Sequence, residues 1–489
     1  SEIKTYWDGA PIYMGVWNHP LMDLLPLNGM AGVEIDKSPN PMRSGNNFAA
    51  VNLQTKNATV DGLQGEVNAS VGSFATKLLQ ANLIGKSGDI QYTLAGGDVK
   101  SDGARANGDG SLQNAMGKLT KQIDRNWHVG GGFMSVNNDV GDPGQSSLAT
   151  YAYNPMLNDP TPKSNGVARN ISKTNMLTAF VAHEHDGWKG EFRYYQNTGE
   201  NNLSQDPTWG TFDSKFNMNG VKWKEEFAPW TNGKLIAGLD QDSVSGSISG
   251  PHVGGAVGNP GAWGIPGTAD VPTFRITSPY VGYSHGIQTG NGWLFQPSVG
   301  VRSYTSNVYN SKTSPNIGAL LSNDRTTLYA NYTEGVLYPG AETYSLTRAL
   351  PALFNVSNGW STIKPTENKH TEVGIKQSID AQTRIDVSLF EDQISNRYTW
   401  SPAPYGGTGA WGNTLPDYKI NGAELSLSHE LDSRWKLFGG VTTLNSSGLD
   451  ANNQLPYAPN MAISLGVTGR ANGYKLSLDA QHQSSMYSL

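Results

Sequence analysis

From Gly62 onward, polar and apolar residues alternate along most of the chain. In NMAISLGVTGR (460–470) the apolar side chains fall on every second position, and GEVNASVG (65–72) repeats this pattern. Alternation with a period of two is typical of a strand whose two faces meet different surroundings. We count roughly nineteen such strands between Leu63 and Ser485, each bounded by turn residues.

The connections between these strands are alternately short and long. Short polar turns are predicted at 85–89, 123–126, 185–187, 289–292, 322–325, 379–382, 431–434 and 471–473. Long connections rich in glycine and proline are predicted at 138–172, 197–213, 245–272, 334–369 and 399–417. Hairpins that are short at one end and long at the other predict an up-and-down antiparallel barrel. In membrane barrels the short turns are periplasmic and the long loops extracellular.

The composition is compatible with a membrane barrel and excludes several other classes. Hydrophobic residues make up 37% of the chain and no run of eighteen apolar residues occurs, which excludes a transmembrane helix. A mean hydropathy of -0.45 fits strands that alternate between lipid and lumen. The chain has no cysteine, so disulfides and thiolate metal sites are excluded. Its net charge of -6 gives no reason to expect nucleic acid as a partner.

A soluble β-protein is the main alternative to a membrane barrel. A propeller would repeat a blade motif about every 40–50 residues, and no such repeat is visible. The sequence also contains neither G-x-S-x-G nor H-E-x-x-H, so we do not expect an enzyme.

The stretch before the alternating region has a different character, with short apolar runs, several prolines and small residues. YWDGAPIY (6–13), DLLPLNGMAGVEIDKSP (23–39) and SGNNFAAVNLQTK (44–56) resemble, in order, the segments that end the plug domain of TonB-dependent outer-membrane receptors. Four later segments resemble barrel motifs of that family in the same order: 328–344, 363–379, 419–431 and 455–467. The chain is therefore identified as a member of this family.

This resemblance implies an all-β fold, a large antiparallel transmembrane barrel with a plug inside it. Residues 1–57 are expected to be the C-terminal part of the plug and residues 58–489 the barrel. A complete barrel of this kind has about 22 strands, so we expect about three strands to be missing at the C-terminal end of this sequence. The N-terminal half of the plug and the TonB-contact segment before it are also absent, and either they precede Ser1 in the protein or the protein lacks them.

The implied function is uptake of a scarce, bulky ligand across the outer membrane of a Gram-negative bacterium. The implied partners are the TonB–ExbB–ExbD energising complex, a ferric siderophore, outer-membrane lipid and lipopolysaccharide, and no cofactor is expected. The alternatives are a non-transporting receptor or scaffold barrel, and uptake of copper, cobalamin or a sugar by the same mechanism. A passive porin is disfavoured by the plug-like start.

The resemblance also implies charged residues that hold the plug in the barrel. Glu372 and Glu424 match the positions of two barrel glutamates of the family, and Lys37 and Arg43 near the end of the plug are their candidate partners. A charge inside a lumen needs a partner because its desolvation is costly. Alternatively, the two glutamates line a wet lumen.

Aromatic residues supply the candidate ligand contacts. In the family the segment after D-G-V-P-I rises towards the extracellular side, which here points to Tyr13, Trp17 and His19. In the long loops we select Trp209, Trp263 and Trp360 because they lie deep within loop sequence. These rings alternatively pack a core or stand in an interfacial girdle.

A metal site in this region is a second possibility. Met14, His19 and Met22 offer thioether and imidazole ligands, which favour Cu(I). Methionine also commonly fills gaps in cores, so the sequence leaves the question of a metal open.

Overall fold

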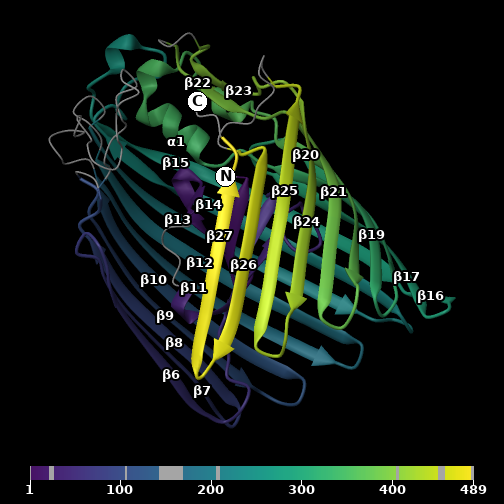
Figure 1. Ribbon diagram of the computed structural model, residues 1–489. Helices are drawn as coiled ribbons and strands as arrows, with labels where there is room; N and C mark the ends of the chain where they lie inside the picture. Colours follow the sequence, from purple (N-terminus) through teal and green to yellow (C-terminus); the bar gives the residue numbers. More distant parts are fainter. Residues whose placement is uncertain are drawn as a thin grey trace.

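The computed structural model describes residues 2–20, 27–104, 107–141, 169–204, 210–403, 407–449 and 458–485. These residues form a large antiparallel barrel with a small β-sheet enclosed by it (Figure 1). We call the small sheet the inner sheet. Among the described residues, none of the helices is long and apolar enough to cross a membrane.

The described part of the barrel contains twenty strands that follow one another in chain order. Strand β16 follows β15 and pairs with the same neighbour, β17. If β15 and β16 are counted as one interrupted strand, the barrel has nineteen strands in the described part of the chain, as predicted. The strands are β6 (Gly62–Val71), β7 (Lys77–Ser87), β8 (Ile90–Ser101), β9 (Gly110–Gln122), β10 (Trp127–Gly141), β11 (Arg169–His185), β12 (Trp188–Ser204), β13 (Thr211–Phe227), β14 (Gly233–Gly250), β15 (Gly267–His285), β16 (Ile287–Gly290), β17 (Trp293–Ser306), β18 (Lys312–Ser322), β19 (Thr326–Leu337), β20 (Thr366–Ser378), β21 (Thr383–Ser395), β24 (Tyr418–Glu430), β25 (Trp435–Ser447), β26 (Met461–Ala471) and β27 (Tyr474–Gln483).

The period of two separates an outer face from an inner face. Phe133 and Leu177 are register partners on β10 and β11, and both are exposed on the outside. Their chain neighbours Met134 and Met176 are also register partners and are almost fully buried inside. The alternation read from the sequence is therefore the alternation between the outer surface and the packed interior of the barrel.

The connection predicted at 245–272 is shorter in the structure. Strands β14 and β15 continue to pair until Gly250 and Gly267, which leaves only residues 251–266 as a loop. The prediction was wrong here because small polar residues such as Ser247 and Ser249 were interpreted as loop sequence. They lie opposite Asp270 and Thr268 in a regular ladder.

The inner sheet has five strands in the order β3-β2-β1-β5-β4. Only β1 and β5 pair in parallel, and the other pairs are antiparallel. Its elements are β1 (Ile3–Trp7), β2 (Ala10–Met14), the 3-10 turn η1 (Gly15–Trp17), β3 (His19–Pro20), the 3-10 turn η3 (Leu27–Gly29), β4 (Met30–Asp36) and β5 (Ala49–Thr55).

The inner sheet lies against one side of the barrel. Its side chains Trp7, Ile12 and Val16 belong to one buried cluster with inward residues of the wall from β8 to β17. At the seam between β27 and β6, by contrast, all ten residues of each strand are exposed. The core of the protein is therefore the interface between the inner sheet and this one part of the wall.

Long loops lie over the end of the barrel opposite the short turns (Figure 1). We call the described residues of 251–266, 338–365 and 396–417 the loop cover. Its elements are η5 (Pro260–Ala262), α1 (Glu342–Ala349), η6 (Pro351–Leu353), η7 (Gly359–Ser361), β22 (Thr399–Ser401) and β23 (Ala410–Gly412). Val253 and Phe354 are fully buried within the cover and belong to the same buried cluster as the inner sheet and the wall, so the cover continues the core.

Candidate functional site

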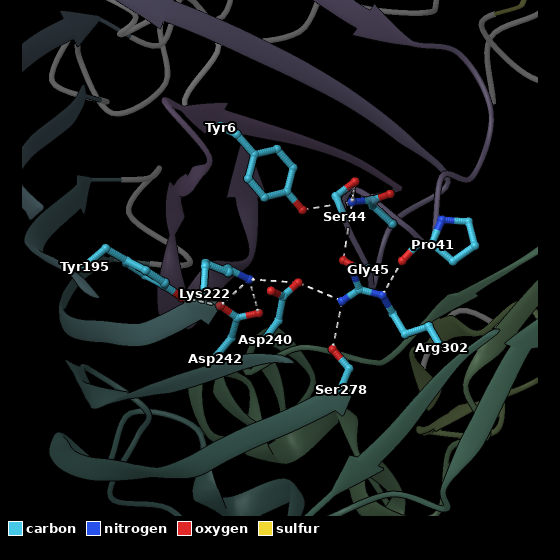
Figure 2. Close-up of polar contacts among 11 residues, drawn as sticks. Tyr6, Pro41, Ser44, Gly45, Tyr195, Lys222, Asp240, Asp242, Ser278 and Arg302 are labelled. Atoms are coloured by element: carbon cyan, nitrogen blue, oxygen red, sulfur yellow. Dashed lines mark hydrogen bonds and ion pairs between the residues drawn. The ribbon is translucent and has the colours of Figure 1, made fainter. Parts of the chain in front are cut away.

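The inner sheet and the barrel are joined at a buried arginine on β17. Arg302 is completely buried, and its Nε donates to the carbonyl oxygen of Pro41 in the inner-sheet segment at 2.6 Å (Figure 2). Its Nη1 donates to Asp240 Oδ2 at 2.6 Å and to Ser278 Oγ at 3.0 Å. The guanidinium also lies 4.0 Å from the centre of the Tyr280 ring. Arg302 therefore connects strands β14, β15 and β17 to the inner sheet.

The charge of Arg302 is part of a longer buried chain. Lys222 Nζ lies 2.9 Å from a carboxylate oxygen of Asp242 and 3.6 Å from Asp240. The hydroxyl of Tyr195 donates to Oδ1 of the same Asp242 carboxylate (Figure 2). Two cations and two carboxylates thus alternate across β13, β14 and β17, so each charge has an opposite neighbour.

A second ion pair fixes the turn between β1 and β2. Asp8 accepts from Lys118 Nζ on β9 at 2.8 Å, and from the backbone N–H and hydroxyl of Thr55 at 3.0 and 2.7 Å. Burial raises the pKa of Asp8, but the Lys118 charge and these hydrogen bonds outweigh it and hold the pKa below its ordinary value. Trp7 fits beside this turn because Gly132 has no side chain. A Cβ there would lie 2.9 Å from the Trp7 ring.

Polar groups of the inner sheet itself are also buried. The Asn47 side chain donates to the hydroxyl of Tyr6 at 2.8 Å and to Ser44 Oγ at 3.1 Å. Burial raises the pKa of Tyr6 to about 12 and lowers the pKa of Lys4 to about 8. The ammonium of Lys4 lies 4.8 Å from the centre of the Tyr13 ring, which offsets part of its desolvation.

The apex of the inner sheet touches both the wall and the loop cover. The indole N–H of Trp17 donates to Ser214 Oγ on β13 at 3.0 Å. The Asn18 side chain donates to Glu342 at the start of α1 at 3.3 Å, and the same Glu342 oxygen accepts from the Tyr398 hydroxyl at 2.7 Å. The apex is therefore in direct contact with the loop cover at Glu342, which in turn is bonded to a second segment of the cover through Tyr398.

The selected loop tryptophans pack within the cover. Trp263 is stacked on His252 with ring centres 3.9 Å apart. Trp360 is half-buried and meets the rings of Tyr344 and Phe274 at 5.2 and 5.7 Å. Trp209 lies outside the described residues. Two of the three selected rings therefore sit in the cover above the apex.

The four residues expected to hold the plug are only partly brought together. Lys37 Nζ lies 2.5 Å from Glu424 Oε2, with the Lys37 side chain 70% exposed. Arg43 instead forms a two-pronged pair with Glu34 of its own sheet, both contacts at 2.6 Å. Glu372 accepts from the Tyr329 hydroxyl at 3.1 Å.

The residues expected at the apex are in different surroundings from one another. Tyr13 is buried beneath Lys4, whereas Trp17 is half-buried at the wall. Met14 is buried, and the backbone register places His19 opposite it. Met22 lies outside the described residues. No group of three His, Asp or Glu side chains that suits a metal occurs in the described part of the chain.

Sequence reasoning missed the strongest contacts of this site. Arg302, Lys222, Asp240 and Asp242 all stand on inward positions of predicted strands, but many other polar residues do so as well. Asp8 was visible inside the YWDG segment, but its partner Lys118 is over a hundred positions away. The available signal was a charged residue at a strand position predicted to face inward. This signal does not indicate which charged residues form pairs.

Comparisons with known proteins agree with this architecture. Residues 68–488 match a family model described as TonB dependent receptor-like, beta-barrel. Among solved structures, the FrpB iron transporter from Neisseria meningitidis is similar with a TM-score of 0.74 at 11% identity, over 98% of this chain and 78% of that one. The copper transporter OprC is similar with a TM-score of 0.75 at 13% identity, over 96% and 75%.

A third similar structure is the ferripyoverdine receptor of the outer membrane of Pseudomonas aeruginosa. Its TM-score is 0.74 at 16% identity, over 98% of this chain and 69% of that one. At these identities the three structures show a shared fold and nothing about the ligand. A search of curated protein sequences finds no match.

Proposed function

Because the chain belongs to the TonB-dependent receptor family, we propose that it takes up a ferric siderophore across the outer membrane, with energy delivered by TonB–ExbB–ExbD. The family consists of transporters and receptors of the Gram-negative outer membrane, and in this proposal lipid and lipopolysaccharide surround the barrel. The observation that carries the proposal is the inner sheet, whose apex meets an aromatic loop cover.

In this proposal the inner sheet, within residues 1–57, acts as a plug, and the barrel of residues 58–489 surrounds it. The apex residue Asn18 contacts Glu342 in the cover, so a ligand held there touches both parts. The buried contacts of Asp8 and Arg302 keep the plug in place until force from the periplasm moves it. Lys37 and Glu424 form a third, exposed contact of the same kind.

A bulky, polar and partly aromatic ligand fits the chemistry of the cover. Trp17, Trp263 and Trp360 supply flat faces, and Glu342 and Asn18 supply polar contacts beside them. Among the proteins that share this fold is a receptor bound to ferripyoverdine.

Copper uptake is the second candidate. The register of β2 and β3 places Met14 opposite His19, and OprC, described as a copper transporter, shares the fold. Thioether and imidazole ligands suit Cu(I).

A binding panel on the purified protein tests both candidates. We expect tryptophan fluorescence to be quenched by one ferric siderophore and not by Cu(I), cobalamin or oligosaccharides. Trp263→Ala should weaken that binding roughly 2- to 10-fold, the value of one aromatic contact. Trp230→Ala is the matched control, because Trp230 is exposed at the short-turn end. Quenching by Cu(I) alone would replace the siderophore proposal with the copper one.

Uptake in cells separates transport from mere binding. A strain that expresses the receptor should accumulate the labelled ligand only when TonB is present. Binding without accumulation would favour the non-transporting receptor or scaffold.

A further inference from the structure

The outer surface of the barrel carries a carboxylate among aromatic rings at the short-turn end. Glu225 on β13 shares its face with Trp223 and Phe227, which are 40% and 45% exposed on the outside. The neighbouring Glu226 has the opposite orientation and pairs with Lys224 and Lys234. Glu225 therefore points outward, towards the membrane interface.

Three side chains, from β11, β12 and β13 itself, converge on this carboxylate. The indole N–H of Trp188 donates to Glu225 Oε2 at 2.8 Å, and the indole N–H of Trp223 donates to Oε1 at 3.0 Å. His183 Nε2 lies 3.1 Å from Oε2. The carboxylate lies over Gly190, where a Cβ would be 2.2 Å from Oε2, so the absence of a side chain makes room for it.

Further rings enclose the group. The rings of Trp127 and His183 are 4.9 Å apart, and those of His183 and Trp188 are 4.6 Å apart. His185 stacks on Trp188 at 5.5 Å. The result is a carboxylate set in a cluster of tryptophan and histidine faces, with its side chain 23% exposed.

The cluster has no permanent cation among the described residues, because its ionisable partner His183 is charged only when protonated. Within the described residues, no lysine or arginine forms an ion pair with Glu225, and the nearby lysines Lys189, Lys224 and Lys234 all pair with Glu226 on the other face. A partly buried carboxylate at a membrane interface is costly without an opposite charge. The faces of the tryptophan rings beside the carboxylate also attract ammonium groups, through the partial negative charge of the ring face.

We propose that the Glu225 cluster binds the ammonium headgroup of a zwitterionic phospholipid in the periplasmic leaflet. The ammonium donates to the open side of the Glu225 carboxylate and rests against the Trp188 and Trp223 rings. The short turns place this end of the barrel at the periplasmic interface, where aromatic side chains meet lipid headgroups. This inference does not depend on the identity of the transported ligand.

Native mass spectrometry of the full chain in detergent tests the proposal. Phosphatidylethanolamine and phosphatidylglycerol with the same acyl chains are added in equal amounts. We expect phosphatidylethanolamine to be retained roughly fivefold more strongly than phosphatidylglycerol. This ratio corresponds to the free energy of one partly exposed charge contact. Glu225→Gln should remove this preference. Glu184→Gln, on the lumen side of β11 at the same height, should keep it.

A second variant covers the case in which Glu225→Gln does not fold. Trp223→Leu keeps the carboxylate and removes one ring face, and it should reduce the preference by roughly half. Heat-modifiable migration on gels shows that each barrel is folded. Equal retention of the two lipids by the wild type, or an unchanged preference in both variants, would overturn the proposal.

Discussion

Two contacts between the inner sheet and the barrel, at Arg302 and at Lys37, are nearly equal in length but differ in burial. Arg302 donates to the Pro41 carbonyl at 2.6 Å and is paired within the wall with Asp240, with side chains 0% and 7% exposed. Lys37 reaches Glu424 at 2.5 Å with side chains 70% and 29% exposed. Distance does not distinguish the two contacts, but burial does.

The difference matters because water screens the exposed pair and not the buried one. A hydrogen bond from a charged donor, such as that from Arg302 to Pro41, is worth about 1.5–3 kcal/mol, whereas an exposed ion pair is worth about 0–1 kcal/mol. We therefore expect the inner sheet to be bound firmly to the wall at β13 to β17 and to separate more readily from β24. Movement of the plug during transport should begin at Lys37.

The largest effect is expected from Arg302→Met. This change leaves Asp240 buried beside a single cation, Lys222, and removes the hydrogen bond to Pro41. We expect the opening free energy of the inner sheet to fall by about 3 kcal/mol, the upper value for a hydrogen bond from a charged donor, because the Pro41 carbonyl loses that donor. Hydrogen exchange at the backbone amides of β1 and β5 measures this loss, because protection reports local opening.

Arg275→Met is the matched control for this variant. Arg275 is exposed on β15, and its Nε donates to Ser243 Oγ at 3.3 Å within the wall. Its removal should leave the protection of β1 and β5 unchanged. Equal protection in the Arg302 variant and the wild type would show that the plug is held elsewhere.

The fold could be predicted from the sequence to a large extent. Alternation is a local property, so a segment such as 460–470 predicts a strand regardless of the residues that surround it in the fold. The two faces of β10 and β11 follow directly from that pattern. The end of β14 was mistaken for a loop because Ser247 and Ser249 carry no apolar signal, although their backbone is fully paired.

The site was harder to predict, because it depends on which strands face the inner sheet. Lys37 and Glu424 were found through family motifs, and the structure places them in contact. Arg302 and Asp240 match no motif, and 62 positions separate them. Their meeting depends on strand register and on the off-centre position of the inner sheet, neither of which is encoded locally.

A smaller but still clear effect is expected from Asp8→Asn. The change removes the ion pair with Lys118, whose side chain is only 13% exposed, and weakens the bonds from Thr55. We expect a loss of about 2 kcal/mol in the opening free energy at neutral pH, measured by the same amide exchange. Asp98→Asn on β8, in an exposed pair with Lys100, should change nothing.

This effect should disappear in acid. The pKa of Asp8 lies below its ordinary value of 3.8 in the folded protein, so its stabilisation is complete above that pH and is lost as the pH falls through the folded pKa. Wild type and variant should therefore differ fully at about pH 7 and 5 and converge once the pH has fallen below the folded pKa of Asp8. A difference that persists in strong acid would assign the contribution of Asp8 to geometry and not to its charge.

The smallest effect is expected at the exposed contact. A double-mutant cycle with Lys37→Gln and Glu424→Gln should give a coupling of about 0–1 kcal/mol in the opening of β4, and salt should remove most of it. The reason is that the Lys37 ammonium is mostly in water, so its desolvation and its attraction to Glu424 are both small. A coupling above about 3 kcal/mol would contradict this and make the two contacts equivalent. The plug would then be held on both sides, and movement would have no preferred starting point.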